Sequence, residues 1–487
     1  MPSRAGAPRT LDDLIRMSEV DGQVHGGSGT TLISDMTHDS RRVSSGSLFC
    51  CVRGSVVDGH DFAIDAVRTG AAALLVDRHV SGVPADVPQI VVSDVRSAIG
   101  PMASAFHGFP SRRLMVVGVT GTNGKTTTCH LIASILRHAG VSVEVLGTLQ
   151  GRFTTPEACD LQREFARMVD DGVRSVVMEV SSHALALHRV DGTGFAATTF
   201  TNLSQDHLDF HGDMESYFAA KARLFTSPFT SVGVVNIDDE YGRRLAELAE
   251  NADVRIVPYS LDDVSGIVVT PTTVEYDWRG RRVSMHMGGR VNVVNSLAAA
   301  LTCRELGFDT ETIAGGLAAA EPVRGRYESI SIDRDFVVLV DYAHTPDGLE
   351  SLLGSLRDSL QDQESAGRLI VVFGCGGDRD RAKRPLMCAF ASRLADAVLV
   401  TSDNPRSENP QSIIDDIVAG VPESHMSRIV LCDTDRRRAI HAALDLARAG
   451  DVVVIAGKGH EVTQSIGLEV LPFDDRVIVR EWEGRAA

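Results

Sequence analysis

The sequence is short of positive charge. It carries 48 Lys and Arg residues against 65 Asp and Glu residues, a formal net charge of -17 at pH 7. Nucleic acids and anionic membranes are bound by basic surfaces, so this balance argues against both as partners. It does not exclude small anionic substrates, because a few arginines, backbone N–H groups and Mg²⁺ can hold those locally.

Cysteine motifs and long apolar runs are also missing. None of the eight cysteines forms a Cys-x-x-Cys pair, and a chain of 487 residues can bury a core without a disulfide framework. No apolar run approaches the roughly 20 residues that span a bilayer. Residues 1–10 lack the apolar segment of a secretion signal. We therefore expect reduced cysteines, no membrane span and a cytoplasmic location.

The remaining composition is that of a globular protein with several domains. Hydrophobic residues make up 43% of the chain, and the mean hydropathy is +0.01. At about 150 residues per domain, the length suggests three domains. Short apolar runs recur at residues 114–119, 175–180, 197–200, 231–235, 336–340, 369–373 and 451–456. Such continuous runs indicate strands buried on both faces, as in a parallel sheet.

We predict an α/β fold with three domains. A smaller N-terminal α/β domain would cover residues 1–111, and a central phosphate-loop domain with a parallel sheet and flanking helices would cover residues 112–325. A C-terminal Rossmann-like α/β domain would cover residues 326–487. Gly and Pro at residues 107–111 indicate a linker at the first boundary. A β-rich insert is expected between residues 266 and 287.

The most informative segment begins with the β-branched run at residues 114–119. A glycine-rich turn and a helical pattern follow this predicted strand. Such a turn directs backbone N–H groups at phosphate oxygens, next to the favourable dipole of a helix N-terminus. Lys125 could reach the β- and γ-phosphates, and the hydroxyl of Thr126 or Thr127 could hold Mg²⁺. Five residues separate Gly118 from Gly124, one more than in the standard pattern, and a chance turn is the alternative to nucleotide binding.

Polar residues follow the next predicted strands, where open α/β sheets bind their ligands. Glu179 ends one strand and is a candidate Mg²⁺ ligand, because Mg²⁺ prefers oxygen donors. Two aspartates and two histidines lie within residues 206–211 after another strand; a helix cap with solvated histidines is the plain alternative. Lys221 lies in an amphipathic helix and, taken alone, is most simply a surface or ion-paired lysine.

Together these segments resemble the Mur ligase family of ATP-dependent amide-bond-forming enzymes. The similarity runs in order through nearly the whole chain, at residues 39–41, 58–60, 120–128, 178–183, 206–212, 341–347, 374–380, 383–387 and 457–461, and in the helix that carries Lys221. The C-terminal segments resemble the branch that adds the third residue of the peptidoglycan stem peptide.

The resemblance implies that ATP binds between the central and C-terminal domains and phosphorylates a substrate carboxylate, after which an amine attacks the acyl phosphate. It implies catalytic roles for Lys125, Glu179, His207 and Lys221. It implies Mg²⁺ ligation by Thr126, Glu179, His207 and Lys221, the last as a carbamate that supplies oxygen ligands. The implied ATP contacts are Gly121, Thr122, Asn123, Gly124, Lys125, Thr126, Thr127, Asn292, Asn295, Arg326, Asp341 and His344.

The resemblance also implies two further small-molecule substrates. UDP-N-acetylmuramoyl-L-alanyl-D-glutamate would contact Ser40, His60, Thr154, Thr155, Ser181 and Arg189. meso-Diaminopimelate would contact Arg379, Asp403, Asn404, Pro405, Arg406, Gly457 and Glu461. Lysine-adding relatives have another residue in place of Arg406. A guanidinium can hold the distal carboxylate of diaminopimelate, which lysine lacks, by two parallel hydrogen bonds. The plain alternative for residues 403–406 is a turn.

The sequence departs from the family in places and leaves other classes of protein open. Residues 150–153 form a shorter connection than in most relatives, and Val291 replaces a frequent aromatic residue near adenine. A phosphate-loop switch or motor, a scaffold-like relative, a lysine-adding ligase and a folyl-polyglutamate ligase are the alternatives. Arg406 argues against the lysine-adding enzyme, and residues 39–41 argue against the folate enzyme. The oligomeric state is not determined, and a monomer is expected.

Overall fold

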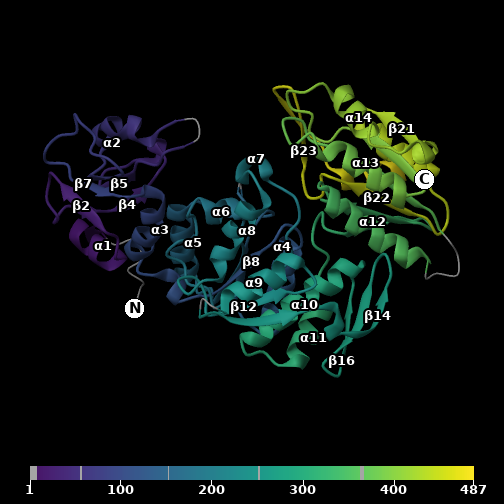
Figure 1. The fold of residues 1–487 in the computed structure, drawn as a ribbon, viewed down its shortest axis with the longest axis horizontal. Coiled ribbons are helices and arrows are strands. Elements are labelled where there is room, and N and C mark those ends of the chain that lie inside the picture. The colour runs from purple at the N-terminus through teal and green to yellow at the C-terminus, as the bar shows by residue number, and fades with distance from the viewer. Residues whose placement is uncertain (1–7, 55–56, 152, 251–252, 362–366, 487) are drawn as a thin grey trace.

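The computed structural model describes residues 8–54, 57–151, 153–250, 253–361 and 367–486. Three α/β units follow one another along an elongated molecule (Figure 1). Residues 1–7, part of the segment in which no secretion signal is expected, and Arg152 of the short connection lie outside the described residues.

The N-terminal unit is built on a five-stranded sheet in the order β2-β7-β6-β5-β4. Only β2 is antiparallel to its neighbour. Leu48, Leu75 and Ile90 of this sheet are fully buried against helices α1 and α3. The elements are β1 Arg9–Thr10, α1 Leu11–Ser18, β2 Gly22–His25, β3 Leu32–Ile33, β4 Asp35–Thr37, η1 Ser40–Arg42, β5 Ser47–Cys50, η2 Gly59–Phe62, α2 Ala63–Thr69, β6 Ala73–Val76, β7 Gln89–Val92, α3 Val95–Phe106 and η3 Pro110–Arg112.

The central unit contains a six-stranded, fully parallel sheet in the order β13-β12-β11-β8-β10-β9. Its elements up to the last strand of the sheet are β8 Met115–Thr120, α4 Lys125–His138, β9 Val143–Leu146, α5 Ala158–Asp170, β10 Ser175–Glu179, α6 Ser182–Ala186, β11 Ala197–Phe200, α7 Leu208–His211, α8 Met214–Ala222, η4 Arg223–Phe225, β12 Val232–Asn236, α9 Glu240–Glu250 and β13 Arg255–Tyr259.

Helices cover both faces of this sheet, which explains the continuous apolar strands. On one face, α4 packs with α10 and α11; on the other, α5, α8 and α9 pack against the strands. A three-stranded antiparallel sheet follows β13 and confirms the predicted β-rich insert. The remaining elements are η5 Leu261–Asp263, β14 Ser265–Val269, β15 Val274–Trp278, β16 Arg281–Met285, α10 Arg290–Glu305 and α11 Thr310–Ala318.

The C-terminal unit has a six-stranded sheet in the order β17-β18-β22-β19-β20-β21, parallel except for β17. A short antiparallel hairpin, β23-β24, stands apart from it. The elements are β17 Glu328–Ile330, β18 Val337–Asp341, α12 Pro346–Gln361, β19 Leu369–Phe373, α13 Lys383–Leu394, β20 Ala397–Thr401, α14 Pro410–Val418, η6 Glu423–Arg428, β21 Ile429–Asp433, α15 Arg436–Leu446, β22 Val452–Ala456, β23 Thr463–Ile466, β24 Glu469–Pro472 and α16 Asp475–Ala486.

The central unit lies between the other two (Figure 1). Helix α3 packs on α5 at the first junction, where the expected linker is a packed segment with His107, Pro110 and Ser111 buried. At the second junction the Arg290 backbone N–H donates to Ser355 Oγ at 2.6 Å. The central unit therefore contacts both of the other units.

The α/β fold class with a parallel central sheet is confirmed. The predicted boundaries at residues 111 and 325 fall between the three sheets, but their positions stay predictions. All eight cysteines are free thiols, and every one except Cys432 is buried. No helix among the described residues is long and apolar enough to cross a membrane.

A fully buried ion pair ties α15 to α16 in the C-terminal unit. Arg436 Nη2 lies 2.7 Å from Asp475 Oδ2, and neither side chain is exposed. Removing one partner of such a pair leaves an uncompensated buried charge. We expect Asp475→Ala to lower the free energy of unfolding of the C-terminal unit by about 3–5 kcal/mol. Urea unfolding followed by tryptophan fluorescence, to which Trp482 of α16 contributes, would measure this loss.

The matched control lies on the same helix. Glu481 pairs with Arg437, and both side chains are about two-fifths exposed at 41% and 40%. Because solvent screens such a pair, Glu481→Ala should cost less than about 1 kcal/mol. Equal losses in the two variants would contradict the role given to burial.

Candidate functional site

The glycine-rich turn predicted to bind phosphate connects β8 to α4. Gly121 and Gly124 have φ values of 151° and 82°. A Cβ atom on Gly121 would lie 1.9 Å from Thr201 Oγ1, and one on Gly124 would lie 2.5 Å from Asn295 Oδ1. Both positions therefore require glycine. The first residue of α4 is Lys125, so the helix N-terminus faces the turn.

Two lysines donate to the carbonyls of this turn. Lys125 Nζ donates to the carbonyl oxygens of Gly121 and Thr122, each at 2.8 Å. Lys221 Nζ, from α8, donates to the same Gly121 oxygen at 2.8 Å, and its side chain is buried. Burial lowers the pKa of Lys221 well below its ordinary value, and the nearby charge of Lys125 lowers it further. Lys221 is thus not a surface residue, and it forms no ion pair within the part of the chain that the structure describes.

Glu179 lies at the end of β10, beside the phosphate loop, and is buried. Its Oε1 accepts from Thr126 Oγ1 at 3.0 Å and from the Thr148 backbone N–H at 2.8 Å. A carboxylate and a hydroxyl therefore lie together, as Mg²⁺ ligation requires. Among the residues that the structure describes, no group of three His, Cys, Asp or Glu side chains forms a metal site by itself. A bound Mg²⁺ would consequently need oxygen atoms from the nucleotide as well.

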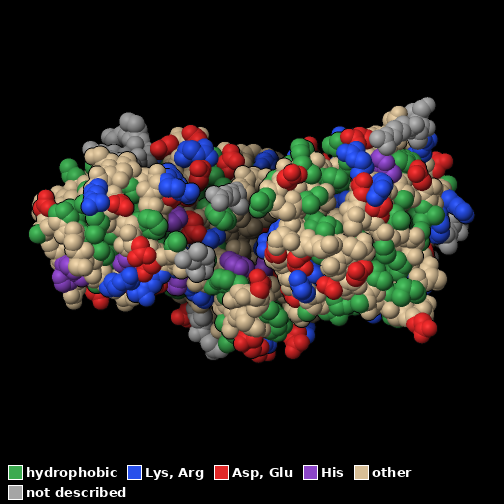
Figure 2. All heavy atoms as spheres, turned by 90° about the horizontal axis from the view of Figure 1, so that it is seen from above, with side chains coloured by type: hydrophobic (Ala, Val, Ile, Leu, Met, Phe, Trp, Pro, Cys, Tyr) green, Lys and Arg blue, Asp and Glu red, His purple; other side chains and the backbone are tan. Residues whose placement is uncertain are grey.

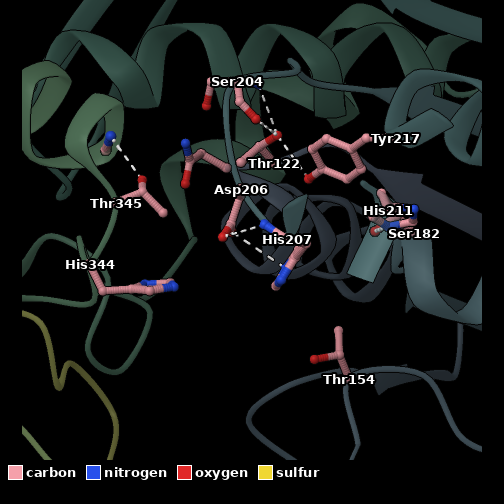
Figure 3. Close-up of polar contacts among 12 residues, drawn as sticks. Thr122, Thr154, Ser182, Ser204, Asp206, His207, His211, Tyr217, His344 and Thr345 are labelled. Atoms are coloured by element: carbon pink, nitrogen blue, oxygen red, sulfur yellow. Dashed lines mark hydrogen bonds and ion pairs between the residues drawn. The ribbon is translucent and has the colours of Figure 1, made fainter. Parts of the chain in front are cut away.

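The acidic and histidine-rich segment after β11 points into the space between the central and C-terminal units (Figure 3). The His207 backbone N–H donates to Asp206 Oδ1 at 2.9 Å, and His207 has a left-handed backbone with φ 54°. Burial lowers the pKa of His207 to about 4. Burial alone would raise the pKa of Asp206, but the charges of His207, His344 and Lys383 outweigh it and hold that pKa below its ordinary value. Two of these three groups belong to the C-terminal unit.

A cavity of about 380 Å³ lies between the phosphate loop and β18. Asn292 and Asn295 line it from α10, and the Asn295 amide donates to Asn292 Oδ1 at 3.1 Å. Arg326 lines the same cavity, stacks on the Tyr342 ring at 4.2 Å and donates to Thr126 Oγ1 at 3.4 Å. The other predicted ATP contacts that line this cavity are Asn123, Gly124, Thr127, Asp341 and His344. Val291, in place of the expected aromatic residue, also lies in this wall.

A second cavity, of about 600 Å³, opens between α7 and the strand ends of the C-terminal sheet. The space-filling view shows a hollow near the middle of the molecule (Figure 2). Of the seven residues predicted to contact diaminopimelate, Pro405 alone is not in its wall; the others are Arg379, Asp403, Asn404, Arg406, Gly457 and Glu461. His207 and His344 line the same cavity from opposite sides.

The hairpin β23-β24 holds the segment of residues 403–406. The Arg406 backbone N–H donates to the Ser465 oxygen at 3.0 Å, and the Gly467 N–H donates to the Arg406 oxygen at 2.6 Å. Arg406 has φ 51°, and its Nη1 donates to the Gly377 oxygen at 2.6 Å. Arg406 thus forms a bridge with Ile466, and the turn lies slightly later than the sequence suggests, where the Glu408 N–H donates to the Pro405 oxygen at 3.1 Å. Arg406 and Asn404 both lie in the cavity wall.

The residues predicted for the UDP-sugar peptide fall into two groups. Thr155 Oγ1 donates to the Glu179 backbone oxygen at 2.9 Å and accepts from the Ser181 N–H at 3.0 Å. Arg189 Nη1 donates to the Thr155 oxygen at 3.3 Å, and Thr154 Oγ1 lies 3.1 Å from Thr148 Oγ1. This group adjoins Glu179.

Ser40 and His60 form the other group, in the N-terminal unit. Neither lines the two cavities. His60 is buried, with Nδ1 2.6 Å from Asp58 Oδ1 and Nε2 accepting from the Asp77 N–H at 3.3 Å. The protein's own groups therefore engage both of its nitrogens. Contact of Ser40 and His60 with a nucleotide stays a prediction.

Sequence reasoning left some residues of the cavity walls without a role. Asp206, Tyr342 and Lys383 all line the larger cavity, and each lies in a segment that resembles the Mur ligase family. Lys383 Nζ donates to the His344 oxygen at 2.9 Å across two elements of the C-terminal unit. Their contacts join residues distant in sequence, so no local pattern indicates them.

Comparison with known proteins identifies the class. Three domain models match in chain order: the Mur ligase family catalytic domain at residues 32–107, the Mur ligase middle domain at residues 119–303 and the Mur ligase glutamate ligase domain at residues 325–459. Together with the close relatives described next, these matches show that the chain belongs to the Mur ligase family.

Two curated relatives carry the name UDP-N-acetylmuramoyl-L-alanyl-D-glutamate–2,6-diaminopimelate ligase. The one from Gloeobacter violaceus is 46% identical over 472 residues, which cover 92% of this chain and 93% of the relative. The one from Geobacillus kaustophilus is 44% identical over 481 residues, covering 94% and 95%. A solved structure of a ligase with that name has a TM-score of 0.67 and 32% identity, covering 98% and 99%. The MurF ligase of Thermotoga maritima in complex with ADP, 17% identical with a TM-score of 0.64 over 93% and 98%, shares the fold.

The phosphate-loop geometry predicts how nucleotide binding depends on Lys125. Saturating ADP with Mg²⁺ at a hundred times its Kd should stabilise the wild-type protein by about 2.7 kcal/mol. Lys125→Ala should lose most of this stabilisation, because no other cation in the described part of the chain donates to both loop carbonyls. Thermal unfolding with and without ADP measures the effect. Arg137→Ala, at the exposed end of the same helix, is the control and should keep the full ADP response.

Proposed function

We propose that this chain is the ATP-dependent ligase that joins meso-diaminopimelate to UDP-N-acetylmuramoyl-L-alanyl-D-glutamate in the synthesis of peptidoglycan precursors. One observation carries the proposal. A phosphate loop and the larger cavity lie on either side of Asp206, His207 and His344, and the wall of that cavity holds Arg406 beside Asn404 and Glu461. The activity named for the relatives needs these two binding sites next to each other.

The reaction has two steps with a balanced exchange of bonds. A carboxylate oxygen of the D-glutamyl residue attacks the γ-phosphorus of ATP, and ADP leaves. The amine of diaminopimelate then attacks the acyl carbon, loses a proton and expels inorganic phosphate, which leaves an amide. The first step brings two anions together, so cations must offset their repulsion. Lys125 and Arg326, both at the phosphate loop, would supply these cations.

We propose Thr126 and Glu179 as the protein's oxygen ligands for Mg²⁺, because their oxygens lie 3.0 Å apart beside the phosphate loop. When bound, Mg²⁺ would neutralise charge on phosphate oxygens. His207 would join a second metal site. Lys221 fits such a site only after conversion to a carbamate, since an ammonium repels a metal ion.

Burial and the charge of Lys125 support carbamate formation at Lys221. CO₂ adds to the neutral amine. Because the pKa of Lys221 is lowered, a larger fraction of its side chain is neutral than that of a solvated lysine at the same pH. The new carboxylate-like group would sit near the Lys125 ammonium, which donates to the same carbonyl. The modification thus replaces a repulsion between two cations by an attraction.

For the amino acid, we propose that Arg406 holds the distal carboxylate and that Glu461 pairs with the distal ammonium. Arg379, Asp403, Asn404, Pro405 and Gly457 would complete the site. For the other substrate, Thr154, Thr155, Ser181 and Arg189 would contact the muramoyl peptide next to Glu179, with Ser40 and His60 on the uridine diphosphate. We place the reaction in the cytoplasm, in keeping with eight free thiols.

The deciding experiment measures phosphate release with ATP, Mg²⁺ and UDP-N-acetylmuramoyl-L-alanyl-D-glutamate. We expect turnover with meso-diaminopimelate and little with L-lysine. Turnover with lysine alone would support the assignment as a ligase and contradict the specificity for diaminopimelate. Phosphate release that needs no amino acid would contradict the assignment as a ligase and favour a nucleotide switch.

The same assay tests Arg406. Arg406→Ala should raise the KM for meso-diaminopimelate at least about 30-fold, because a buried charge–charge contact is lost, and leave the KM for ATP nearly unchanged. Arg381→Ala is the matched control: its side chain is 70% exposed and pairs with Glu408 outside the cavity. Equal losses for ATP and diaminopimelate in Arg406→Ala would refute the assignment.

The carbamate can be observed directly, because the chain has only four lysines, at positions 125, 221, 383 and 458. In ¹³CO₂-equilibrated protein, we expect one carbamate carbon resonance that disappears in Lys221→Ala. That variant should lose activity by at least about a hundredfold and regain part of it with acetate. Full activity in Lys221→Ala, or a resonance that persists in it, would exclude the carbamate at this position.

A further inference from the structure

Lysine is rare in this chain, and its four positions are not scattered. With 48 basic residues and four lysines, arginine supplies the other 44 cations. Lys125 and Lys221 lie at the phosphate loop, and Lys383 lines the larger cavity. The fourth, Lys458, has no role in the function proposed above. Since the chain uses arginine for ordinary surface charge, a lysine kept in the interior requires an explanation.

Lys458 lies directly behind the wall of the larger cavity and is fully buried. Its Nζ donates to Asn404 Oδ1 at 3.2 Å and to Glu461 Oε2 at 3.0 Å, and it lies 3.5 Å from Asp403 Oδ1. An ammonium has three protons to donate. All three partners of Lys458 are residues that line the cavity, so one buried group links three parts of its wall.

The segment around Lys458 keeps these contacts rigid. The Asn404 amide donates to Glu461 Oε2 at 2.9 Å, while Asn404 Oδ1 also accepts from the Ser465 N–H at 2.9 Å. Gln464, on the hairpin, donates to the Asp403 backbone oxygen at 2.7 Å. Lys458 is the cationic member of this network, and Gln464 is a neutral member that holds the same segment.

The charges around this end of the cavity balance. Asp380, Asp403 and Glu461 contribute three negative charges, and Arg379, Arg406 and Lys458 contribute three positive ones. Arg436 lies behind them, but it is paired with Asp475 at 2.7 Å and adds no net charge. The distal end of meso-diaminopimelate carries one ammonium and one carboxylate, so it is also neutral. The side chain of L-lysine ends in an ammonium alone. Without Lys458, the pocket would carry a net negative charge and would favour the lone ammonium.

We propose that Lys458 is a positioning and specificity-determining residue of the amino-acid site: by linking Asp403, Asn404 and Glu461 and balancing their charge, it makes the pocket select a zwitterionic end. This inference rests on the proposed function. Two groups would then discriminate between diaminopimelate and lysine. Arg406 attracts the distal carboxylate of diaminopimelate, and Lys458 offsets the negative charge that would otherwise favour the lone distal ammonium of lysine. Lys458 touches no substrate and acts through the residues that it holds.

The test compares Lys458→Met with Gln464→Leu, the matched variant that loosens the same segment without changing charge. For each, kcat and KM are measured with meso-diaminopimelate, L-lysine and ATP. Lys458→Met should raise the KM for diaminopimelate about 30-fold and change the KM for ATP by less than threefold. The ratio of kcat/KM for diaminopimelate over lysine should fall at least about tenfold. Gln464→Leu should raise both amino-acid KM values together and keep that ratio within about threefold.

An unchanged ratio in Lys458→Met, or an equal fall in Gln464→Leu, would overturn the proposal. Lys458→Gln repeats the test if the Met variant does not fold. If neither variant folds, inhibition of the wild-type enzyme by 2-aminopimelate and by L-lysine decides, since the two carry opposite single charges at the distal end. Similar inhibition by both supports a neutral pocket, and inhibition at least about tenfold stronger by 2-aminopimelate excludes it. Failure of the proposed function is a separate result, because the wild-type protein would then show no turnover with diaminopimelate.

Discussion

The phosphate loop is held by two lysine side chains that donate to one backbone oxygen. Lys125 and Lys221 come from helices far apart in the sequence, and both reach the carbonyl of Gly121 at 2.8 Å. Two positive charges this close repel each other, and with burial this repulsion lowers the pKa of Lys221. The carboxylate of Glu179, which also lies beside the loop, accepts from Thr126 and Thr148. A negative charge bound at this loop would relieve the repulsion, so cations can be concentrated here in a protein that is acidic overall.

The parallel sheets make this concentration possible. In a parallel sheet all strands end at one edge, so the segments after β8, β10 and β11 converge although they are tens of residues apart. The segments after β10 and β11 line the larger cavity, and the C-terminal sheet presents its own strand ends, after β18, β19, β20 and β22, to that cavity. Neither sheet holds a complete site. The residues of the cavity wall meet because the strand ends of the two sheets face each other across the junction at Arg290 and Ser355.

Much of the fold was accessible from the sequence, because apolar runs determine buried strands. Residues 197–200 and 369–373 are strands with the predicted bounds, and the insert before α10 is a small sheet as expected. Local motifs also located the phosphate loop and Glu179. The contacts of Lys221 and Lys458 were not accessible in this way, because each depends on a partner about 100 or about 50 residues distant in sequence. The packed segment at residues 107–111 differs from the expected linker because Gly and Pro reveal a change of chain direction and not its burial.

The carboxylate of Asp341 has a mechanical consequence. It accepts from the Tyr327 N–H at 2.6 Å and the Ala343 N–H at 2.7 Å, and so joins the connecting segment to the end of β18. A Cβ atom on Gly325 would lie 2.0 Å from the His460 nitrogen, so that residue is also packed on the C-terminal unit. Arg326 lies between these contacts and is therefore anchored to the C-terminal unit. A rotation of that unit about the segment before Gly325 would change the distance from Arg326 to Thr126, which is 3.4 Å between Nη2 and Oγ1 here, so this distance would report the separation of the two units.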